Sequence, residues 1–174
     1  MKNEWEHNYV KIVQERGHED FFLRFSLAHK ITHLTIISPW ITTLKDEQYT
    51  LNEIIKKIND ENIETLVFMR SPFKEKHNMD SAELFFKCPT VTLYYNDELH
   101  AKVYICRCEP FGFALVGSAN LSGRATRAHE IGLMIDGKGK GIDTIKELQN
   151  LSLHDLPNRS GTIKVDKQGG MKWK

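Results

Sequence analysis

Short apolar runs rich in β-branched residues recur along this chain, and the segments between them change in character half-way. The six runs are 33–38, 64–69, 90–95, 101–107, 113–117 and 131–135. Helix-like segments separate the first three runs, whereas no helix of normal length separates the fourth from the fifth. Strands joined through helices favour parallel pairing, and strands joined by a turn pair antiparallel. The chain is therefore predicted to have an α/β fold, with a mixed parallel/antiparallel sheet flanked by helices.

The segments with helical spacing of apolar residues complete this outline. They are 5–29, read as one or two helices interrupted near Gly17, then 46–59, 77–87 and 142–153. Glu109 to Gly112 supplies the turn of a hairpin. Residues 137–141, with glycine and lysine alternating, are interpreted as a flexible turn because the P-loop pattern is missing.

Length and composition favour one soluble domain. The chain has 174 residues and no apolar run long enough to span a bilayer, so no membrane partner is expected. We expect a domain over 1–157 and a basic, flexible C-terminal tail over 158–174. The start of the chain lacks the pattern of a secretion signal, and its three cysteines form no disulfide framework, which favours a cytoplasmic location. With 24 basic and 23 acidic side chains, net charge does not predict nucleic-acid binding.

Two short motifs carry the chemistry. His100-Ala-Lys102 is followed, after 14 intervening residues, by Gly117-Ser118-Ala-Asn120. Together they supply an imidazole, an ammonium, a hydroxyl and a carboxamide, groups that can hold and attack a phosphodiester. In a strand, His100 and Lys102 would project from the same face, because side chains alternate with a period of two.

These residues resemble the signature of the phospholipase D superfamily, particularly its single-motif bacterial nuclease and restriction-endonuclease branch. Glu130, ten residues after Asn120, and Ile37-Ser-Pro-Trp-Ile41 extend the resemblance. It implies a phospholipase D-like fold with helices on both faces of the sheet. The chain departs from the family at Arg107, where an acidic residue that supports the hairpin is expected.

The resemblance implies a catalytic role for His100, Lys102, Ser118, Asn120 and Glu130, without a metal or cofactor. His100 would attack phosphorus, and a second histidine would protonate the leaving oxygen. Lys102 and Asn120 would bind phosphate oxygens and Ser118 would orient them. Glu130 would accept a hydrogen bond from the imidazole and select its tautomer.

The chain contains only half of such a site. Of its eight histidines, only His100 is followed two positions later by lysine, and no internal repeat is present. The second histidine must then come from another copy, which predicts a two-fold homodimer with a shared site.

Each assignment has a structural alternative. Ser118 and Asn120 could cap the turn that follows them, and Glu130 could be a solvated residue at a strand edge. Arg124 and Arg127 could bind flanking phosphates or lie on the surface. Trp40 could stack on a base near the cleft or pack under the edge of the sheet.

The favoured function is a metal-independent DNA endonuclease of the restriction or anti-phage type. Its small size suggests a cleavage subunit in a larger complex with a targeting or ATPase subunit. The alternatives are a phospholipid-processing enzyme and a catalytically silent docking subunit. Cys106 and Cys108 share a predicted strand face, but without a second pair at zinc spacing they are interpreted as ordinary thiols.

Overall fold

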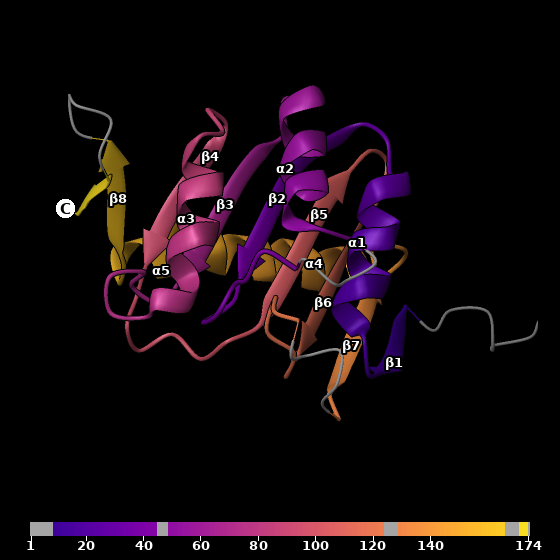
Figure 1. Cartoon of the computed structure of the whole chain (residues 1–174). Helices are drawn as coiled ribbons and strands as arrows, with labels where there is room; N and C mark the ends of the chain where they lie inside the picture. The colour runs from indigo at the N-terminus through magenta and orange to yellow at the C-terminus, as the bar shows by residue number, and fades with distance from the viewer. Residues whose placement is uncertain (1–8, 45–48, 124–128, 166–170, 174) are drawn as a thin grey trace, which may run out of the picture.

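A computed structural model describes residues 9–44, 49–123, 129–165 and 171–173 of the chain. The strands of this part are β1 (Val10–Gln14), β2 (Ile31–Ile37), β3 (Glu64–Met69), β4 (Val91–Tyr95), β5 (Val103–Cys108), β6 (Gly112–Gly117), β7 (Ile131–Asp136), β8 (Gly161–Val165) and β9 (Met171–Trp173). They form one sheet in the order β1-β7-β6-β5-β2-β3-β4-β8-β9 (Figure 1).

The sheet is mixed, as predicted. β2, β3 and β4 pair in parallel, and every other neighbouring pair among the described strands is antiparallel. The parallel strands are those joined through helices, and the β5–β6 pair is a hairpin. Connection length therefore decided strand direction, as the sequence indicated.

Helices cover both faces of the sheet, as predicted. One face carries α1 (Gly17–Leu27), α2 (Leu51–Asp60), the short η1 (Lys76–Asn78) and α3 (Met79–Phe86). The other carries α4 (Gly141–Asn150), which continues through η2 (Leu151–Asp155) into α5 (Leu156–Asn158) (Figure 1). None of the helices in the described ranges has the length and apolar character needed to cross a membrane.

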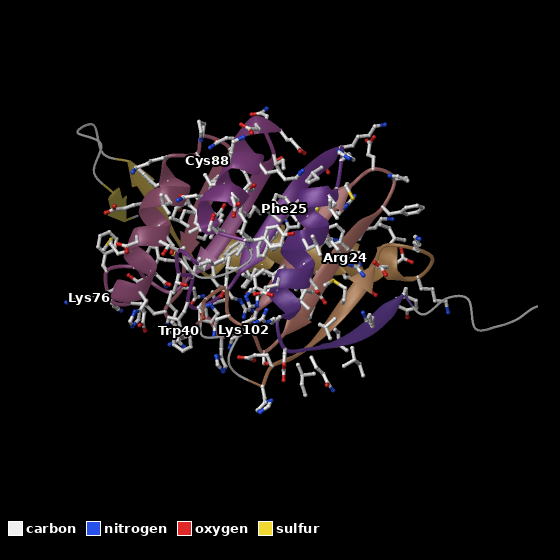
Figure 2. The ribbon with its side chains drawn as sticks, turned by 45° about the vertical axis from the view of Figure 1, so that its right-hand side comes forward. Arg24, Phe25, Trp40, Lys76, Cys88 and Lys102 are labelled. Carbon is white, nitrogen blue, oxygen red and sulfur yellow. The ribbon has the colours of Figure 1, made fainter. Side chains whose placement is uncertain are left out.

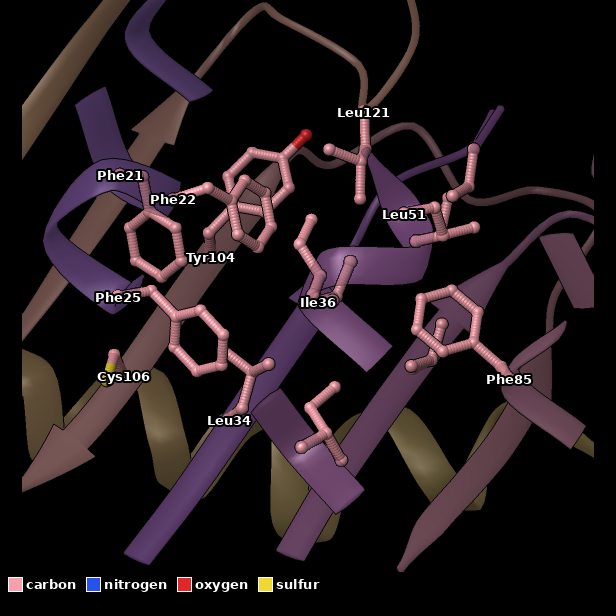
Figure 3. Packing of buried hydrophobic residues seen from close by; sticks show 14 of the residues in the cluster. Phe21, Phe22, Phe25, Leu34, Ile36, Leu51, Phe85, Tyr104, Cys106 and Leu121 are labelled. Atoms are coloured by element: carbon pink, nitrogen blue, oxygen red, sulfur yellow. The ribbon is translucent and has the colours of Figure 1, made fainter. Parts of the chain in front are cut away.

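The main core lies between the sheet and the first helical layer. Phe21, Phe22 and Phe25 of α1 are buried, and the first two contact the ring of Tyr104 on β5 (Figure 3). Burying each such ring contributes about 1.5–3 kcal/mol. A smaller core beneath α4 contains Ile145. Because both faces are buried, the central strands read as continuous apolar runs rather than alternating ones.

The first structured segment differs from the sequence prediction. Residues 10–14 form β1, antiparallel to β7, and the helix begins only at Gly17. Val10, Ile12 and Val13 are β-branched, a class that favours pleated, half-buried surfaces. β7, at the edge of the sheet, supplied hydrogen-bond partners, which the spacing of apolar residues along the chain did not reveal. The interpretation of this stretch as helix was therefore wrong.

The C-terminal segment also differs. β8 pairs antiparallel with β4, and β9 pairs with β8, so the described residues of this segment extend the sheet. Gly161 lies so close to Tyr95 that an added Cβ would be 2.3 Å from its ring. Only glycine allows this approach of strand to ring. The pairing covers what would otherwise be an exposed edge at β4.

The topology brings one set of chain segments to a single edge of the sheet. The parallel strands β2, β3 and β4 all end there. β5 is antiparallel to β2 and therefore begins there, β6 ends there and β7 begins there. The carboxyl ends of parallel strands are a common location for binding sites in α/β proteins.

Candidate active site

The predicted catalytic residues lie at this edge. His100 and Lys102 directly precede β5, Ser118 and Asn120 directly follow β6, and Glu130 directly precedes β7. The strand predicted from 101 begins at Val103, so the His-x-Lys motif lies in the approach to β5 rather than within it. A bond from the Gly117 N–H to the Lys102 carbonyl, 3.1 Å long, still fixes this approach against β6.

Lys102 and His100 are in direct contact. Nζ of Lys102 lies 3.1 Å from Nδ1 of His100 and donates to the His100 carbonyl at 2.8 Å. The side chain of Lys102 is nearly buried, whereas His100 is exposed. The buried lysine therefore contacts the imidazole, while the ring remains accessible to a substrate.

Burial lowers the pKa of Lys102, because it removes water from the ammonium. The carboxylate of Glu130 opposes this effect, and the positive charge of Arg70 adds to it. Lys102 thus has an acidic and a basic neighbour in the folded protein. Arg70 directly follows β3 and Lys102 directly precedes β5, and the repulsion between these two cations favours binding of an anion.

Ser118 connects β6 to Glu130. Its hydroxyl donates to Oε2 of Glu130 and accepts from the N–H of Ile131 at 3.2 Å. The hydrogen bond predicted between Glu130 and the imidazole is not present in this single chain, where Ser118 is the partner of the carboxylate. Glu130 is half-buried and lies beside Tyr104 and Gly117.

The carboxamide of Asn120 has an unsatisfied acceptor. Its Oδ1 is buried and has no hydrogen-bond partner. The Asn120 side chain lines a hollow of about 580 Å³ together with Trp40, Thr42, Glu75, His77 and Ser122. The turn after Asn120 is closed by backbone, through the Ser122 N–H to the Asn120 carbonyl at 2.8 Å, so it needs no side-chain cap from Asn120.

Trp40 combines features of both roles considered for it. The guanidinium of Arg70 lies 5.2 Å from the ring centroid, which is a packing contact. The same ring is half-exposed and lines the hollow. Figure 2 labels Trp40 and Lys102, both toward the lower side of the view.

Three buried polar residues that the sequence did not single out position this edge. The Ser38 hydroxyl donates to the Trp40 carbonyl at 2.8 Å and accepts from the Leu121 N–H at 3.0 Å. The Tyr104 hydroxyl donates to the Ala119 carbonyl at 2.9 Å, and burial raises its pKa.

The third is Asn78, whose side chain is completely buried. It donates to the carbonyls of Pro39 at 2.8 Å and Arg70 at 2.9 Å, and accepts from the Ile41 N–H at 2.8 Å. Asn78 therefore ties together the segments that follow β2 and β3. Its sequence surroundings are those of any helix start, so no local signal could have identified it.

Other candidate residues fall into separate groups. Arg124 and Arg127 lie outside the described residues. Arg107, which replaces the expected acidic residue, donates to Oε1 of Gln149 and so joins β5 to α4.

Cys106 is buried, and a hydrogen bond with it lowers the pKa of Cys108 to about 7. Among the described residues, no three His, Cys, Asp or Glu side chains gather closely enough to hold a metal ion.

Solved structures with this architecture include a member of the phospholipase D family. Nuc from Salmonella typhimurium, a member of that family, matches with a TM-score of 0.61 and 12% identity over 88% of this chain and 97% of its own. This chain has a phospholipase D-like fold. NucT from Helicobacter pylori matches with a TM-score of 0.57 and 14% identity, over 87% of this chain and 98% of its own.

The fold also occurs within longer proteins. TrmBL2, an archaeal chromatin protein, matches over 88% of this chain but 53% of its own, with a TM-score of 0.55 and 11% identity. No family model matches the sequence, and neither does any curated protein. The likeness is therefore one of three-dimensional structure, and the phospholipase D-like fold expected from the motif is confirmed.

Proposed function

We propose that the chain is a phosphodiesterase that cleaves DNA without a metal ion. The observation that carries this proposal is the contact between Lys102 and His100 at the sheet edge that also holds Ser118, Asn120 and Glu130. An accessible imidazole, a desolvated ammonium and a carboxamide with a free acceptor site stand together there. No other cluster in the described part of the chain combines these groups.

A bound phosphodiester would supply an acceptor to the donors of this site. Its anionic oxygens would accept from Lys102, which is costly to keep charged while buried, and offset its repulsion with Arg70. The amide hydrogens of Asn120 would donate to the same group. Such donors, placed before the reaction begins, stabilise the additional negative charge of the transition state.

The chemistry then proceeds in two displacements. Nε2 of His100 forms a bond to phosphorus while the bond to the leaving alkoxide breaks, and His100 of a second copy gives its proton to that alkoxide. Water next attacks the phosphohistidine, giving its proton to the second imidazole, and the bond to Nε2 breaks. Each histidine returns to its starting state, and no redox partner is required.

A second copy has an apolar surface to occupy. Val10, Ile12, Ile131 and Leu133 are exposed on β1 and β7, with Ile12 and Ile131 more than 60% exposed. Ile12 pairs with Leu133 across the strands, so both project from the same face. The patch reaches the site, because the Ile131 carbonyl accepts from the Ser118 N–H. Burying it against a second copy would bring two sites together.

DNA is the favoured substrate over phospholipid. The half-exposed Trp40 ring beside the site suits a base. TrmBL2, which shares the fold, is described as having a novel mode of DNA binding. We extend the proposal to a restriction or anti-phage cleavage subunit, directed by a targeting or ATPase subunit, in which Arg124 and Arg127 bind flanking phosphates.

The test compares the unaltered protein with His100→Ala on labelled DNA, RNA and phosphatidylcholine vesicles in excess EDTA. His29→Ala is the matched control, because His29 is exposed at the opposite edge of the sheet. We expect cleavage of DNA that persists in EDTA, is lost in His100→Ala and is kept in His29→Ala. Cleavage that requires a metal or survives His100→Ala would overturn the mechanism. Turnover of vesicles alone would assign the site to phospholipids.

A further inference from the structure

The hollow beside the catalytic residues differs from them in chemistry. Its described lining consists of Trp40, Thr42, Glu75, His77, Asn120 and Ser122, an indole with hydroxyls, a carboxylate, an imidazole and a carboxamide. None of these described lining residues is a lysine or an arginine. A phosphate would therefore find its cationic partner at Lys102 and not here. The hollow suits a flat, uncharged group with polar edges.

Its size agrees with such a ligand. A volume of about 580 Å³ lies within the range of about 300–1,000 Å³ that is usual for small-molecule sites. It is continuous with the catalytic residues, because Asn120 belongs to both. In a nucleic-acid strand bound at the catalytic residues, the group next to the bound phosphodiester would therefore enter the hollow directly.

The walls are fixed before any ligand arrives. Asn78 anchors the wall that bears His77 to the one that bears Trp40, through the bonds to Pro39 and Ile41. Arg70 packs on the Trp40 ring and also pairs with Glu75, Nη1 to Oε1 at 3.8 Å. Preorganised walls lower the entropy cost of binding.

The polar groups of the hollow include both a strong acceptor and a group that can donate. The carboxylate of Glu75 accepts from an exocyclic amino group, and the imidazole of His77 can donate to or accept from a ring nitrogen. An indole offers a stacking surface to any base. These are the groups that read the edge of an unpaired nucleobase.

We propose that this hollow is a subsite for the unpaired, amino-bearing nucleobase next to the cleaved phosphodiester, with Trp40 stacking on it and Glu75 and His77 reading its edge. This proposal rests on the proposed function. It adds that the enzyme acts on single-stranded DNA or on a base turned out of the duplex, because a paired base has no free edge.

The test measures kcat/KM on two single-stranded DNA substrates of equal length, one of cytidine nucleotides and one of abasic tetrahydrofuran nucleotides. The ratio of the two values reports the base alone, because both strands carry the same phosphodiesters. We expect a ratio on the order of tenfold or more in the unaltered protein. Trp40→Ala and His77→Ala should bring this ratio toward one, whereas Trp40→Phe should keep most of it and His29→Ala all of it.

Glu75→Gln separates edge reading from stacking. It should lower the rate on the cytidine strand relative to a thymidine strand, which lacks the amino group. Equal rates on cytidine and abasic strands in the unaltered protein, or an unchanged ratio in both Trp40→Ala and His77→Ala, would overturn the subsite while leaving the proposed function intact. Failure to cleave either strand would overturn both. Circular dichroism of each variant shows whether it is folded.

Discussion

The ammonium of Lys102 lies 3.1 Å from Nδ1 of His100. A lysine ammonium has hydrogens but no acceptor, so Nδ1 must be the acceptor in this contact. The neutral imidazole then carries its proton on Nε2. A nucleophilic Nε2 must be free of its proton, so the contact has to change when substrate binds and Lys102 moves to a phosphate oxygen.

This relationship predicts a change of tautomer. Long-range proton–nitrogen NMR should show the Nε2–H form of His100 in the free protein at alkaline pH. Inorganic phosphate should shift the population toward the Nδ1–H form, since it competes for Lys102, and Lys102→Met should produce the same shift without phosphate. The resonances of exposed His29 serve as the control. An Nδ1–H form in the free protein would contradict the arrangement seen here.

Replacing Lys102 should separate stability from activity. Lys102→Met should lower the cleavage rate by about 10²–10³-fold, because a donor to the transition state is lost. Yet it should raise the free energy of unfolding at neutral pH by roughly 1 kcal/mol, because it removes a buried charge.

The pH dependence of this stability difference follows from the sign of the shift. The pKa of Lys102 is lower in the folded state than in the unfolded chain. Between the two values the unfolded state binds more protons, so the stability of the unaltered protein rises with pH there. The advantage of Lys102→Met in urea unfolding should therefore shrink as the pH approaches the usual lysine pKa. An advantage that grows with pH would contradict it.

Asn78 should matter for both folding and catalysis without touching substrate. Asn78→Ala leaves the Ile41 N–H and the carbonyls of Pro39 and Arg70 without their partner. We expect a loss of about 3 kcal/mol in the free energy of unfolding, together with a higher KM as the Trp40 segment loosens. Asn150→Ala, on the exposed surface of α4, should change neither quantity.

Ser118 should act through Glu130. Ser118→Ala removes the hydroxyl that donates to the carboxylate, and we expect a decrease of about tenfold in kcat with an altered acidic limb of the pH–rate profile. Ser26→Ala, at the far end of α1, is the matched control. If Ser118 only closed a turn, Ser118→Ala would change thermal stability and leave the shape of the profile intact.

The shared site predicts a specific mixing result. Equal amounts of unaltered and His100→Ala protein are mixed and allowed to exchange subunits. The mixture should have about a quarter of the activity of the same total amount of unaltered protein, because only dimers with two intact histidines turn over. Half of the activity would indicate independent sites. Ile12→Glu together with Leu133→Glu places charges in the exposed apolar patch. This variant should sediment as a monomer and lose cleavage.

Sequence alone determined the parts of this protein that depend on neighbours along the chain. The apolar runs that became β2, β3 and β4 are separated by helices, and β5 and β6 by a turn, so spacing was sufficient to predict a mixed sheet flanked by helices. The motif residues His100, Lys102, Ser118 and Asn120 were found in the same way. Their meeting at one edge follows from where those strands begin and end.

Only the tertiary structure decided what depends on residues distant in the chain. Residues 10–14 became a strand because the edge at β7 was open to them, and β8 formed against β4 for the same reason. The burial of Lys102, the pairing of Ser118 with Glu130 and the anchoring by Asn78 each require atoms brought together by folding. Local patterns specify the periodicity of a segment. The rest of the molecule supplies its hydrogen-bond partners and determines how far it is exposed to solvent.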